Sequence, residues 1–500
     1  MRIRFDRGTL VLDRVEPGLA PGILDGASWD SELCAWRMPA SSLSELRVRL
    51  ADNHVRATDT IAPAPLAAPL AHPPLRWYQQ AAVDAWRAAH HRGVIALPTG
   101  AGKTLAALAA ISALRTSTLV LVPTRILLDQ WARTLEAYAP TAIGRLGDNT
   151  HRVEPLTVAT YASAITWAPR VGDRFGLVVV DEAHHVGAWC PHEILEMLVA
   201  PARLGLTATP PAAATALTTH VGPTVYSISI PELAGDALAP FDAITIPLAL
   251  APDERAAYRT HRAIFAAAYG EHQRRHPDAT WRDFTSTAYR TARGRAALAA
   301  WRASRAVLAY PAAKRAALRD LLAQHAADRI LIFTADNATA YAIARELLVV
   351  PITGDIKRAE RDRMLARFRS GAAPVLVSSQ VLDEGLDVPE ADIAIIVGGS
   401  GSERRHVQRI GRVLRPRPNK RAVIYELAIT SSSELDQLAR RNRPLRSEAP
   451  DAFPDAPPPD AFPSSRPPDA FPDAMPPAAF VNSPPPDAPL LDNPHAESAP

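Results

Sequence analysis

Short apolar runs alternate with helical patterns along most of this 500-residue chain. Because the runs contain little polar alternation, they predict strands that are buried on both faces of a sheet. The helical segments between them predict parallel pairing, and parallel sheets bind ligands at the carboxyl ends of their strands. The chain is therefore expected to be of the α/β class. The runs that predict strands are 94–97, 118–122, 157–160, 177–180, 330–333, 375–377, 393–397 and 422–427.

Changes in this pattern divide the first half of the chain into three parts. Residues 1–60 predict a small N-terminal α/β domain, with short strands at its start and a helix over 42–52. Residues 61–74 are rich in Ala and Pro and are typical of a linker, because repeated prolines prevent a helix. Residues 75–249 then predict the first parallel-sheet domain.

The second half divides in the same way. Residues 250–309 are rich in Ala and Arg and predict a helical insert, whose aromatic residues suit either a grip on nucleic acid or an ordinary helical core. Residues 310–447 predict a second parallel-sheet domain. Residues 448–500 are about one-third Pro, with Asp-Ala-Phe-Pro repeated at Asp451, Asp460 and Asp469. This composition predicts a disordered C-terminal tail.

A glycine-rich loop after the run at 94–97 carries the clearest candidate chemistry. It predicts a turn of closely spaced backbone N–H groups that leads into a helix, an arrangement that cradles phosphate. Lys103 can reach the β- and γ-phosphates, and the Thr104 hydroxyl can ligate Mg²⁺. The alternative is a turn whose lysine is merely solvated. The expected nucleotide contacts are Leu97, which replaces the usual first glycine, Pro98, Thr99, Gly100, Ala101, Gly102, Lys103 and Thr104.

Two acidic residues, Asp181 and Glu182, follow the run at 177–180. In a phosphate-loop enzyme the first acid holds Mg²⁺, and the second can orient and deprotonate a water in line with the γ-phosphate. An acidic pair can instead cap a helix, but its place after a strand of the same sheet favours catalysis. Thr207 and Thr209 follow the next short strand, where they suit either a link to the acidic pair or ordinary strand propensity.

Two further patterns point to the same nucleotide. Upstream of the loop, the amide of Gln79 has the donor and the acceptor that reading an adenine edge requires, although it could equally be an exposed polar side chain on a helix. The second predicted sheet has no phosphate loop but carries Arg409, Arg412 and Arg415 near one helix face. Such a face is often only solvated, yet Arg412 and Arg415 are the expected arginine fingers for the first domain.

Composition narrows the picture. The net charge is only +3, so any affinity for nucleic acid must come from local patches. The two cysteines have no metal-ligand spacing, and His272 and His276 enclose two arginines, so no structural zinc is expected. The N-terminus lacks the apolar segment of a signal peptide, and no run of about eighteen apolar residues occurs. A cytoplasmic protein without a membrane partner is expected.

Taken in order, these motifs resemble those of superfamily 2 helicases, most closely the XPB type in its short archaeal form. The resemblance covers about residues 2–434 and implies two tandem RecA-like domains. It likens residues 1–60 to a damage-recognition domain and residues 250–309 to a thumb-like element. The motifs that carry it are 75–79, 98–104, the DEAH box at 181–184, 207–209, 378–387 and 408–415.

The resemblance implies an ATP-dependent DNA helicase or translocase that moves 3′ to 5′ in nucleotide excision repair or transcription-coupled remodelling. It implies a monomer that acts on single-stranded or forked DNA, with a nuclease or another repair protein as a partner. Its implied cofactors are ATP, with adenine near Gln79, and Mg²⁺ on Thr104 and Asp181. The implied catalytic residues are Lys103, Asp181, Glu182, Gln408, Arg412 and Arg415, and Gly385 and Asp387 join the nucleotide contacts. The implied DNA contacts are Pro123, Thr124, Arg125, Thr160, Tyr161, Thr334, Thr353, Gly354, Ser378 and Ser379.

One departure from the family pattern affects unwinding. Members typically carry Arg-Glu-Asp soon after the Thr-Ala-Thr motif, whereas Pro-Pro-Ala-Ala-Ala occupies 210–214 here. This departure favours one open alternative, a nucleotide-gated protein that binds DNA without unwinding it. An RNA-stimulated ATPase built on the same motor is a second alternative, independent of this departure.

Overall fold

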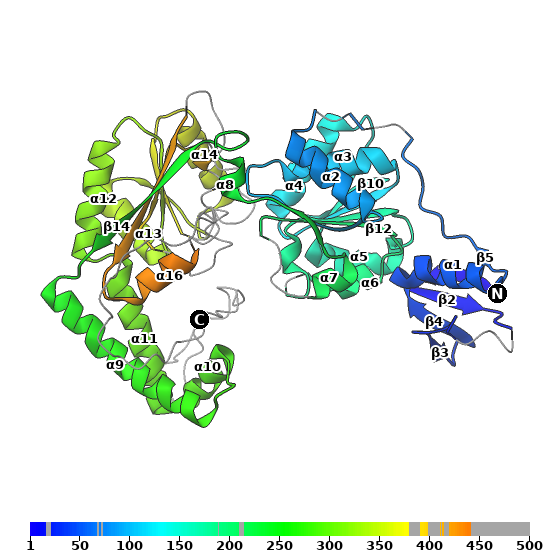
Figure 1. Cartoon of the computed structure of the whole chain (residues 1–500), viewed down its shortest axis with the longest axis horizontal. Coiled ribbons are helices and arrows are strands. Elements are labelled where there is room, and N and C mark those ends of the chain that lie inside the picture. Colours follow the sequence, from blue (N-terminus) through cyan, green and yellow to red (C-terminus); the bar gives the residue numbers. More distant parts are fainter. Residues whose placement is uncertain are drawn as a thin grey trace, which may run out of the picture. The chain divides into compact units, whose positions relative to one another are not determined.

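In the part of the chain that it describes, the computed structural model contains three β-sheets with helices packed against them (Figure 1). Among the described helices, none combines the length and the hydrophobicity that crossing a lipid bilayer requires. The predicted tail over 448–500 lies outside the described residues, as do Gly385, Asp387, Gln408, Arg412 and Arg415. The structure describes residues 1–16, 22–67, 70–71, 74–188, 190–209, 215–379, 391–398, 411, 413–414 and 420–441.

The N-terminal domain is a five-stranded sheet in the order β3-β4-β2-β1-β5. Leu43, Leu46 and Leu50 recur at helical spacing and bury one face of a helix against Leu10 and Leu12 of the sheet. This amphipathic pattern is why the helix over 42–52 could be predicted. The elements are β1 (Arg2–Asp6), β2 (Thr9–Asp13), β3 (Ser28–Asp30), β4 (Ala35–Pro39), η1 (Ala40–Ser42), α1 (Leu43–Asp52) and β5 (Thr58–Asp59).

The first large sheet has eight strands in the order β13-β6-β12-β11-β7-β10-β8-β9. All neighbours pair in parallel except β8 and β9, which form a hairpin. The parallel strands therefore end at one common edge, where the predicted motifs stand. The strands are β6 (Arg92–Ala96), β7 (Thr118–Val122), β8 (Ile143–Gly147), β9 (Thr150–Arg152), β10 (Leu156–Thr160), β11 (Leu177–Val180), β12 (Ala202–Thr207) and β13 (Thr224–Ser227).

Helices cover both faces of this sheet (Figure 1). Val120 and Val179 pack on the face of α2, α3 and α4, whereas Leu119 and Val178 pack on the face of α5, α6 and α7. Both faces are buried, which is why the central strands of this sheet are apolar at most positions. The helices are α2 (Trp77–Ala88), α3 (Lys103–Leu114), α4 (Arg125–Tyr138), α5 (Tyr161–Val171), η2 (Ala183–His185), α6 (Glu193–Glu196), α7 (Ala216–His220) and α8 (Ile230–Leu233).

The second large sheet has six parallel strands in the order β14-β19-β18-β15-β17-β16. Its α12 and α13 pack against Ile330, Ile332 and Ile395, on the opposite face from Phe333. The elements are β14 (Phe241–Leu248), α12 (Ala312–Gln324), β15 (Ile330–Phe333), α13 (Asn337–Leu347), β16 (Val350–Ile352), α14 (Arg358–Arg369), β17 (Val375–Ser378), β18 (Ile393–Ile396), β19 (Ala422–Ile429) and α16 (Ser433–Arg441).

Strand β14 corrects one predicted boundary. It pairs with β19 over its whole length, from Phe241 opposite Ala422 to Leu248 opposite Ile429. The first sheet therefore ends before residue 241, and the predicted boundary at 249 is wrong. The sequence order placed this strand beside the first domain, but its pairing partner lies about 180 residues later in the chain, as the register shows.

The helical insert contains three helices, α9 (Pro252–Arg275), α10 (Trp281–Tyr289) and α11 (Ala292–Ala309). Its central residues, 263–301, belong to a compact unit separate from the sheets. Aromatic residues form the core of this unit, with Phe265, Tyr269 and Phe284 in mutual contact. The sequence left open whether the aromatic residues of this insert bind nucleic acid or form a helical core. These three rings form a helical core. Tyr289, in contrast, is 48% exposed.

Candidate nucleotide site

The glycine-rich loop joins the end of β6 to the start of α3, as the sequence predicts. Gly100 and Gly102 have φ of +89° and +78°, values that favour glycine. A Cβ atom on Gly102 would also collide with the side-chain nitrogen of Gln79. Gly102 is the N-cap of α3, so the free N–H groups of the first helical turn follow it directly. The loop therefore has the backbone conformation that an anion site requires.

Gln79 lies beneath this loop and is only 3% exposed. Its Nε2 donates to the Ala101 carbonyl at 2.8 Å, and its Oε1 accepts from the Arg76 backbone N–H at 3.0 Å. The Tyr78 hydroxyl donates to the same Ala101 carbonyl at 2.9 Å. Both ends of the Gln79 amide are therefore engaged, so this residue connects the start of α2 to the phosphate loop.

Two polar side chains of the loop are candidates for binding phosphate. The Lys103 Nζ donates to the Leu97 carbonyl at 3.2 Å, a contact within the loop itself. The Thr99 hydroxyl is buried and has no hydrogen-bond partner among the described residues. A buried hydroxyl without a partner costs free energy, and phosphate oxygens would supply its partner. The loop residues thus fit a bound triphosphate.

Asp181 stands directly after β11 and is buried. Its Oδ2 accepts from the Trp131 indole N–H at 2.8 Å, and its Oδ1 accepts from the Glu182 backbone N–H at 3.0 Å. Burial raises the pKa of Asp181, and the Trp131 hydrogen bond and the charge of Lys103 oppose that rise. Because β6 and β11 are parallel strands of one sheet, the phosphate loop and the acidic pair follow the same edge of that sheet. With the Thr104 hydroxyl, Asp181 would supply the oxygen ligands that Mg²⁺ prefers.

Glu182 adopts a left-handed backbone conformation, with φ of +49°. Residues other than glycine seldom adopt it, and such strain persists where the surrounding structure imposes it. The His184 Nδ1 lies 3.4 Å from the Glu182 carboxylate and 3.3 Å from the Thr207 hydroxyl. That hydroxyl donates to the Thr209 carbonyl at 2.9 Å. The acidic pair is thereby connected through His184 to the end of β12, the link considered for these threonines.

We call the first and second parallel-sheet domains the first and second lobes. The second lobe approaches the phosphate loop at Gly411. A Cβ atom added there would lie 2.6 Å from both Cβ and O of Thr99. The Leu414 carbonyl accepts from the Ala239 N–H at 2.8 Å, which anchors Leu414 itself. Gln408, Arg412 and Arg415 flank this contact in sequence but lie outside the described residues, so their predicted roles stay predictions.

Replacing Gly411 by Ala is expected to reduce kcat for ATP hydrolysis by about tenfold to 100-fold, because displacing the second lobe by an ångström misplaces its groups. Gly398→Ala is the matched control, since its added Cβ would meet its nearest atom at 3.7 Å, an ordinary contact. Equal activities of the two variants would contradict this contact.

Three family models match successive parts of the chain. They are the Xeroderma pigmentosum group B helicase damage recognition domain at residues 3–61, the Type III restriction enzyme res subunit at 72–212, and the Helicase conserved C-terminal domain at 313–417. The chain is also 32% identical over 450 residues to the DNA 3′-5′ translocase XPB2 of Sulfurisphaera tokodaii, covering 88% of this chain and 99% of that protein. This chain belongs to the XPB-type helicases. It is thus a helicase-family enzyme of superfamily 2 with two RecA-like domains, as predicted.

Other XPB-type relatives are longer than this chain. Identity is 32% over 391 residues with the putative DNA 3′-5′ helicase Rad25 of Halobacterium salinarum, covering 77% of this chain and 59% of the relative. Identity is 27% over 390 residues with the DNA 3′-5′ helicase XPB of Mycobacterium tuberculosis, covering 74% of this chain and 63% of that relative. The helicase domain of Pyrococcus furiosus Hef aligns with a TM-score of 0.49 at 19% identity, over 73% of this chain and 97% of that one.

The DNA contacts predicted for the first domain of this XPB-type helicase stand at strand ends. Thr124 and Thr160 cap α4 and α5 by accepting from backbone N–H groups. Arg125 is exposed and lies 3.2 Å from Asp148. Tyr161 is buried, and its hydroxyl donates to the Asp181 carbonyl. Tyr161 therefore supports the acidic pair in this conformation, while Arg125, beside Pro123 and Thr124, is accessible to a ligand.

The predicted contacts of the second domain are mostly buried as well. Thr334, Thr353, Ser378 and Ser379 are at most 1% exposed. The Thr334 hydroxyl donates to the Asp336 carbonyl at 2.9 Å, and the Ser378 hydroxyl to the Ile352 carbonyl at 2.9 Å. Gly354 is exposed beside Thr353. These hydroxyls hold the strand ends in place, and their predicted contact with DNA stays a prediction.

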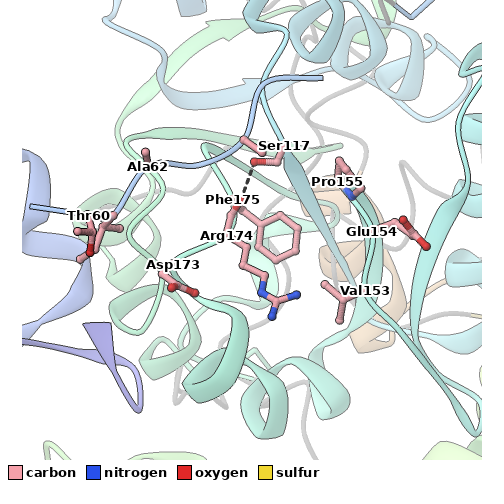
Figure 2. Close-up of a pocket in the computed structure, with 11 residues that line it drawn as sticks. Thr60, Ala62, Ser117, Val153, Glu154, Pro155, Asp173, Arg174 and Phe175 are labelled. Atoms are coloured by element: carbon pink, nitrogen blue, oxygen red, sulfur yellow. Dashed lines mark hydrogen bonds between the residues drawn. The ribbon is translucent and has the colours of Figure 1, made fainter. Parts of the chain in front are cut away.

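A cavity of about 290 Å³ lies elsewhere, lined by residues of the first domain and by Thr60, Ile61, Ala62 and Ala64 (Figure 2). Ser117, Pro155 and Phe175 line it, and they precede β7, β10 and β11 respectively. It is therefore at the amino ends of the parallel strands, opposite the edge that carries Lys103 and Asp181. The Ser117 hydroxyl donates to the Arg174 carbonyl across it at 2.6 Å. This cavity is separate from the nucleotide chemistry.

Proposed function

We propose that this XPB-type helicase is an ATP-driven DNA translocase that moves 3′ to 5′ along single-stranded or forked DNA, as a monomer, in DNA repair. The observation that carries the proposal is the single cluster of Lys103, Asp181 and Glu182 at the carboxyl edge of the first sheet, with Gly411 of the second lobe against Thr99. A nuclease or another repair protein is the expected partner.

The chain's own residues suit each step of hydrolysis. The loop N–H groups and Lys103 bind the triphosphate, and Thr99 gains a partner for its buried hydroxyl. Mg²⁺ held by Thr104 and Asp181 would neutralise charge on the β- and γ-phosphates. Glu182 is held in a strained conformation next to Asp181, where its carboxylate can accept a proton from the attacking water. Arg412 and Arg415 are the proposed cations from the second lobe.

The hydrogen-bond chain from Glu182 offers a route to DNA. His184 contacts both the catalytic carboxylate and Thr207, and Thr207 donates to the Thr209 backbone. A change in the charge or position of Glu182 during hydrolysis therefore moves atoms at the end of β12. Because a backbone grip carries little sequence information, the motor should select strand type and structure over sequence.

The test is ATPase activity and strand displacement measured side by side on single-stranded, forked and duplex DNA and on RNA. Strong stimulation by single-stranded or forked DNA, with displacement of a 3′-tailed duplex, is the expected result. Preferential stimulation by RNA would favour an RNA-stimulated ATPase. An ATPase that nucleic acid does not stimulate would refute the proposal.

One observation favours a translocase that separates strands poorly. The segment after Thr209, residues 210–214, consists of Pro and Ala, whereas the resemblance led us to expect Arg-Glu-Asp soon after Thr209. Without that charged element we expect weak displacement, although ATPase and translocation remain. A streptavidin-displacement assay on single-stranded DNA separates the two activities, because it requires movement but no unwinding. A protein that binds DNA without moving would fail this assay.

A further inference from the structure

His192, Glu196 and His220 form a cluster of potential metal ligands on the first domain. One ligand atom from each of the three lies within 4.8 Å of the other two. The His220 Nε2 is 3.8 Å from the Glu196 Oε1, and the two imidazole rings stack with centroids 5.2 Å apart. All three side chains are partly exposed, so an ion in solution can reach them. Small side-chain rotations would bring the three atoms to ligand spacing.

The chain brings these residues together from two short helices. His192 has helical φ and ψ and precedes α6, so Glu196, four residues later, lies on the same helical face. His220 is the last residue of α7. Both helices lie near the amino ends of β6 and β12, on the opposite edge of the sheet from the phosphate loop. The cluster is therefore independent of the nucleotide site.

A buried arginine fixes the two helices to each other. Arg203, 1% exposed, donates from its guanidinium to the carbonyls of His220 at 2.6 Å, Leu195 at 2.9 Å and Leu198 at 3.1 Å. One side chain thus holds the backbone of both ligand-bearing segments. Holding both backbones in place reduces the ordering that metal binding must impose.

The donor set indicates the class of metal. Two imidazoles and one carboxylate suit Zn²⁺ and its neighbours Co²⁺ and Ni²⁺, whereas Mg²⁺ prefers oxygen ligands throughout. The His192 Nδ1 lies 3.7 Å from the Glu193 carboxylate, which leaves its Nε2 for the metal. A carboxylate behind a ligating imidazole is the usual arrangement around metal-bound histidine.

We propose that His192, Glu196 and His220 bind a divalent transition metal of the zinc type, with water as the fourth ligand. The ion clamps α6 to α7. Met197, which directly follows α6, packs against Gly8 of the N-terminal domain, so the clamp stiffens the surface on which that domain rests. This proposal departs from the expectation of no structural zinc, which considered the cysteines and the His272–His276 pair.

The experiment uses the full chain, stripped with chelator and free of nucleotide. Co²⁺ is titrated while its visible d–d absorption is recorded, and Zn²⁺ binding is measured by calorimetry. We expect one site per chain and a rise of several degrees in Tm with Zn²⁺. The variant His192→Ala/His220→Ala should weaken binding by about 100-fold or more, since even loss of a second-shell group costs 10- to 100-fold.

Two comparisons keep the result interpretable. The control variant His272→Ala/His276→Ala removes two histidines outside the cluster. It should leave Zn²⁺ binding and the Zn²⁺-induced rise in Tm unchanged. If the double variant at the cluster does not fold, Glu196→Gln preserves size and should still weaken binding. Mg²⁺-dependent ATPase is expected to persist in these variants, which separates this proposal from the motor function. Equal Zn²⁺ affinity in the native chain and a folded cluster variant would overturn the proposal.

Discussion

Replacing Glu182 by Gln is expected to lower kcat for ATP hydrolysis by about 100- to 10,000-fold while leaving ATP binding close to normal. The amide preserves the size of the side chain but does not accept a proton from water at neutral pH. The phosphate loop is untouched, because Asp181, Lys103 and the glycines keep their contacts. Phosphate release and equilibrium binding of a fluorescent ATP analogue would measure the two effects separately.

The control for Glu182→Gln is Glu136→Gln, the same chemical change at an exposed position on α4. Glu136 lies 2.7 Å from Arg145 and far along its helix from the strand ends, so its loss should leave turnover unchanged. Because Glu182 also contacts His184, the variant should show weaker coupling between DNA binding and nucleotide binding. Near-normal turnover in Glu182→Gln would exclude this glutamate as the base.

Much of the fold could be predicted because its strands are buried on both sides. The runs Thr118–Val122, Leu177–Val180 and Ile330–Phe333 form strands with the predicted bounds. A short run that is apolar at nearly every position is typical of a strand in the middle of a parallel sheet. The hairpin of β8 and β9 was not predicted, because it contains glycines and polar residues and stands at the sheet edge. No strand was predicted over residues 241–248, which were included in the first domain, because local pattern does not specify a pairing partner.

The parts of the candidate nucleotide site that could be predicted are those whose polar residues lie in one contiguous segment. The loop with Lys103 and the pair of Asp181 and Glu182 are each contiguous, and the structure places them at one edge. The hydrogen bond from Trp131 to Asp181 was not predictable, since α4 and β11 are joined only by tertiary packing. The burial of Tyr161 is a similar case: the sequence gives its position at a strand end but not the direction of its side chain.

The ligand cluster of His192, Glu196 and His220 shows a different limit of sequence reasoning. The spacing from His192 to Glu196 is a weak signal, because a histidine and a glutamate four residues apart are common on solvated helices. His220 lies 24 residues beyond Glu196 in the numbering, on a separate helix. Tertiary contacts, among them the guanidinium of Arg203 that holds both backbones, bring the three together. Metal ligands gathered by tertiary packing leave no motif to find.

Replacing Lys103 by Ala is expected to reduce ATP turnover by about 100- to 1,000-fold, because one preorganised donor to developing charge is lost. Unlike Glu182→Gln, this change should also weaken binding of the triphosphate, since the lysine is a cation directed at the phosphates in the ground state. The shape of the loop should persist, because Gly102, Gln79 and the Ala101 carbonyl retain their contacts without it. Titration with the fluorescent analogue, alongside phosphate release, measures both losses.

The matched control for Lys103→Ala is Lys420→Ala, in which the lysine removed from the second lobe donates to the Val413 carbonyl at 2.6 Å. That change should lower the melting temperature through loss of a buried hydrogen bond, yet nucleotide binding to the first lobe should survive. The two variants thus distinguish a lysine that binds phosphate from a lysine that stabilises the fold. If Lys103→Ala bound the analogue as tightly as the native chain and hydrolysed ATP at a comparable rate, the triphosphate would have to lie somewhere other than the loop between β6 and α3.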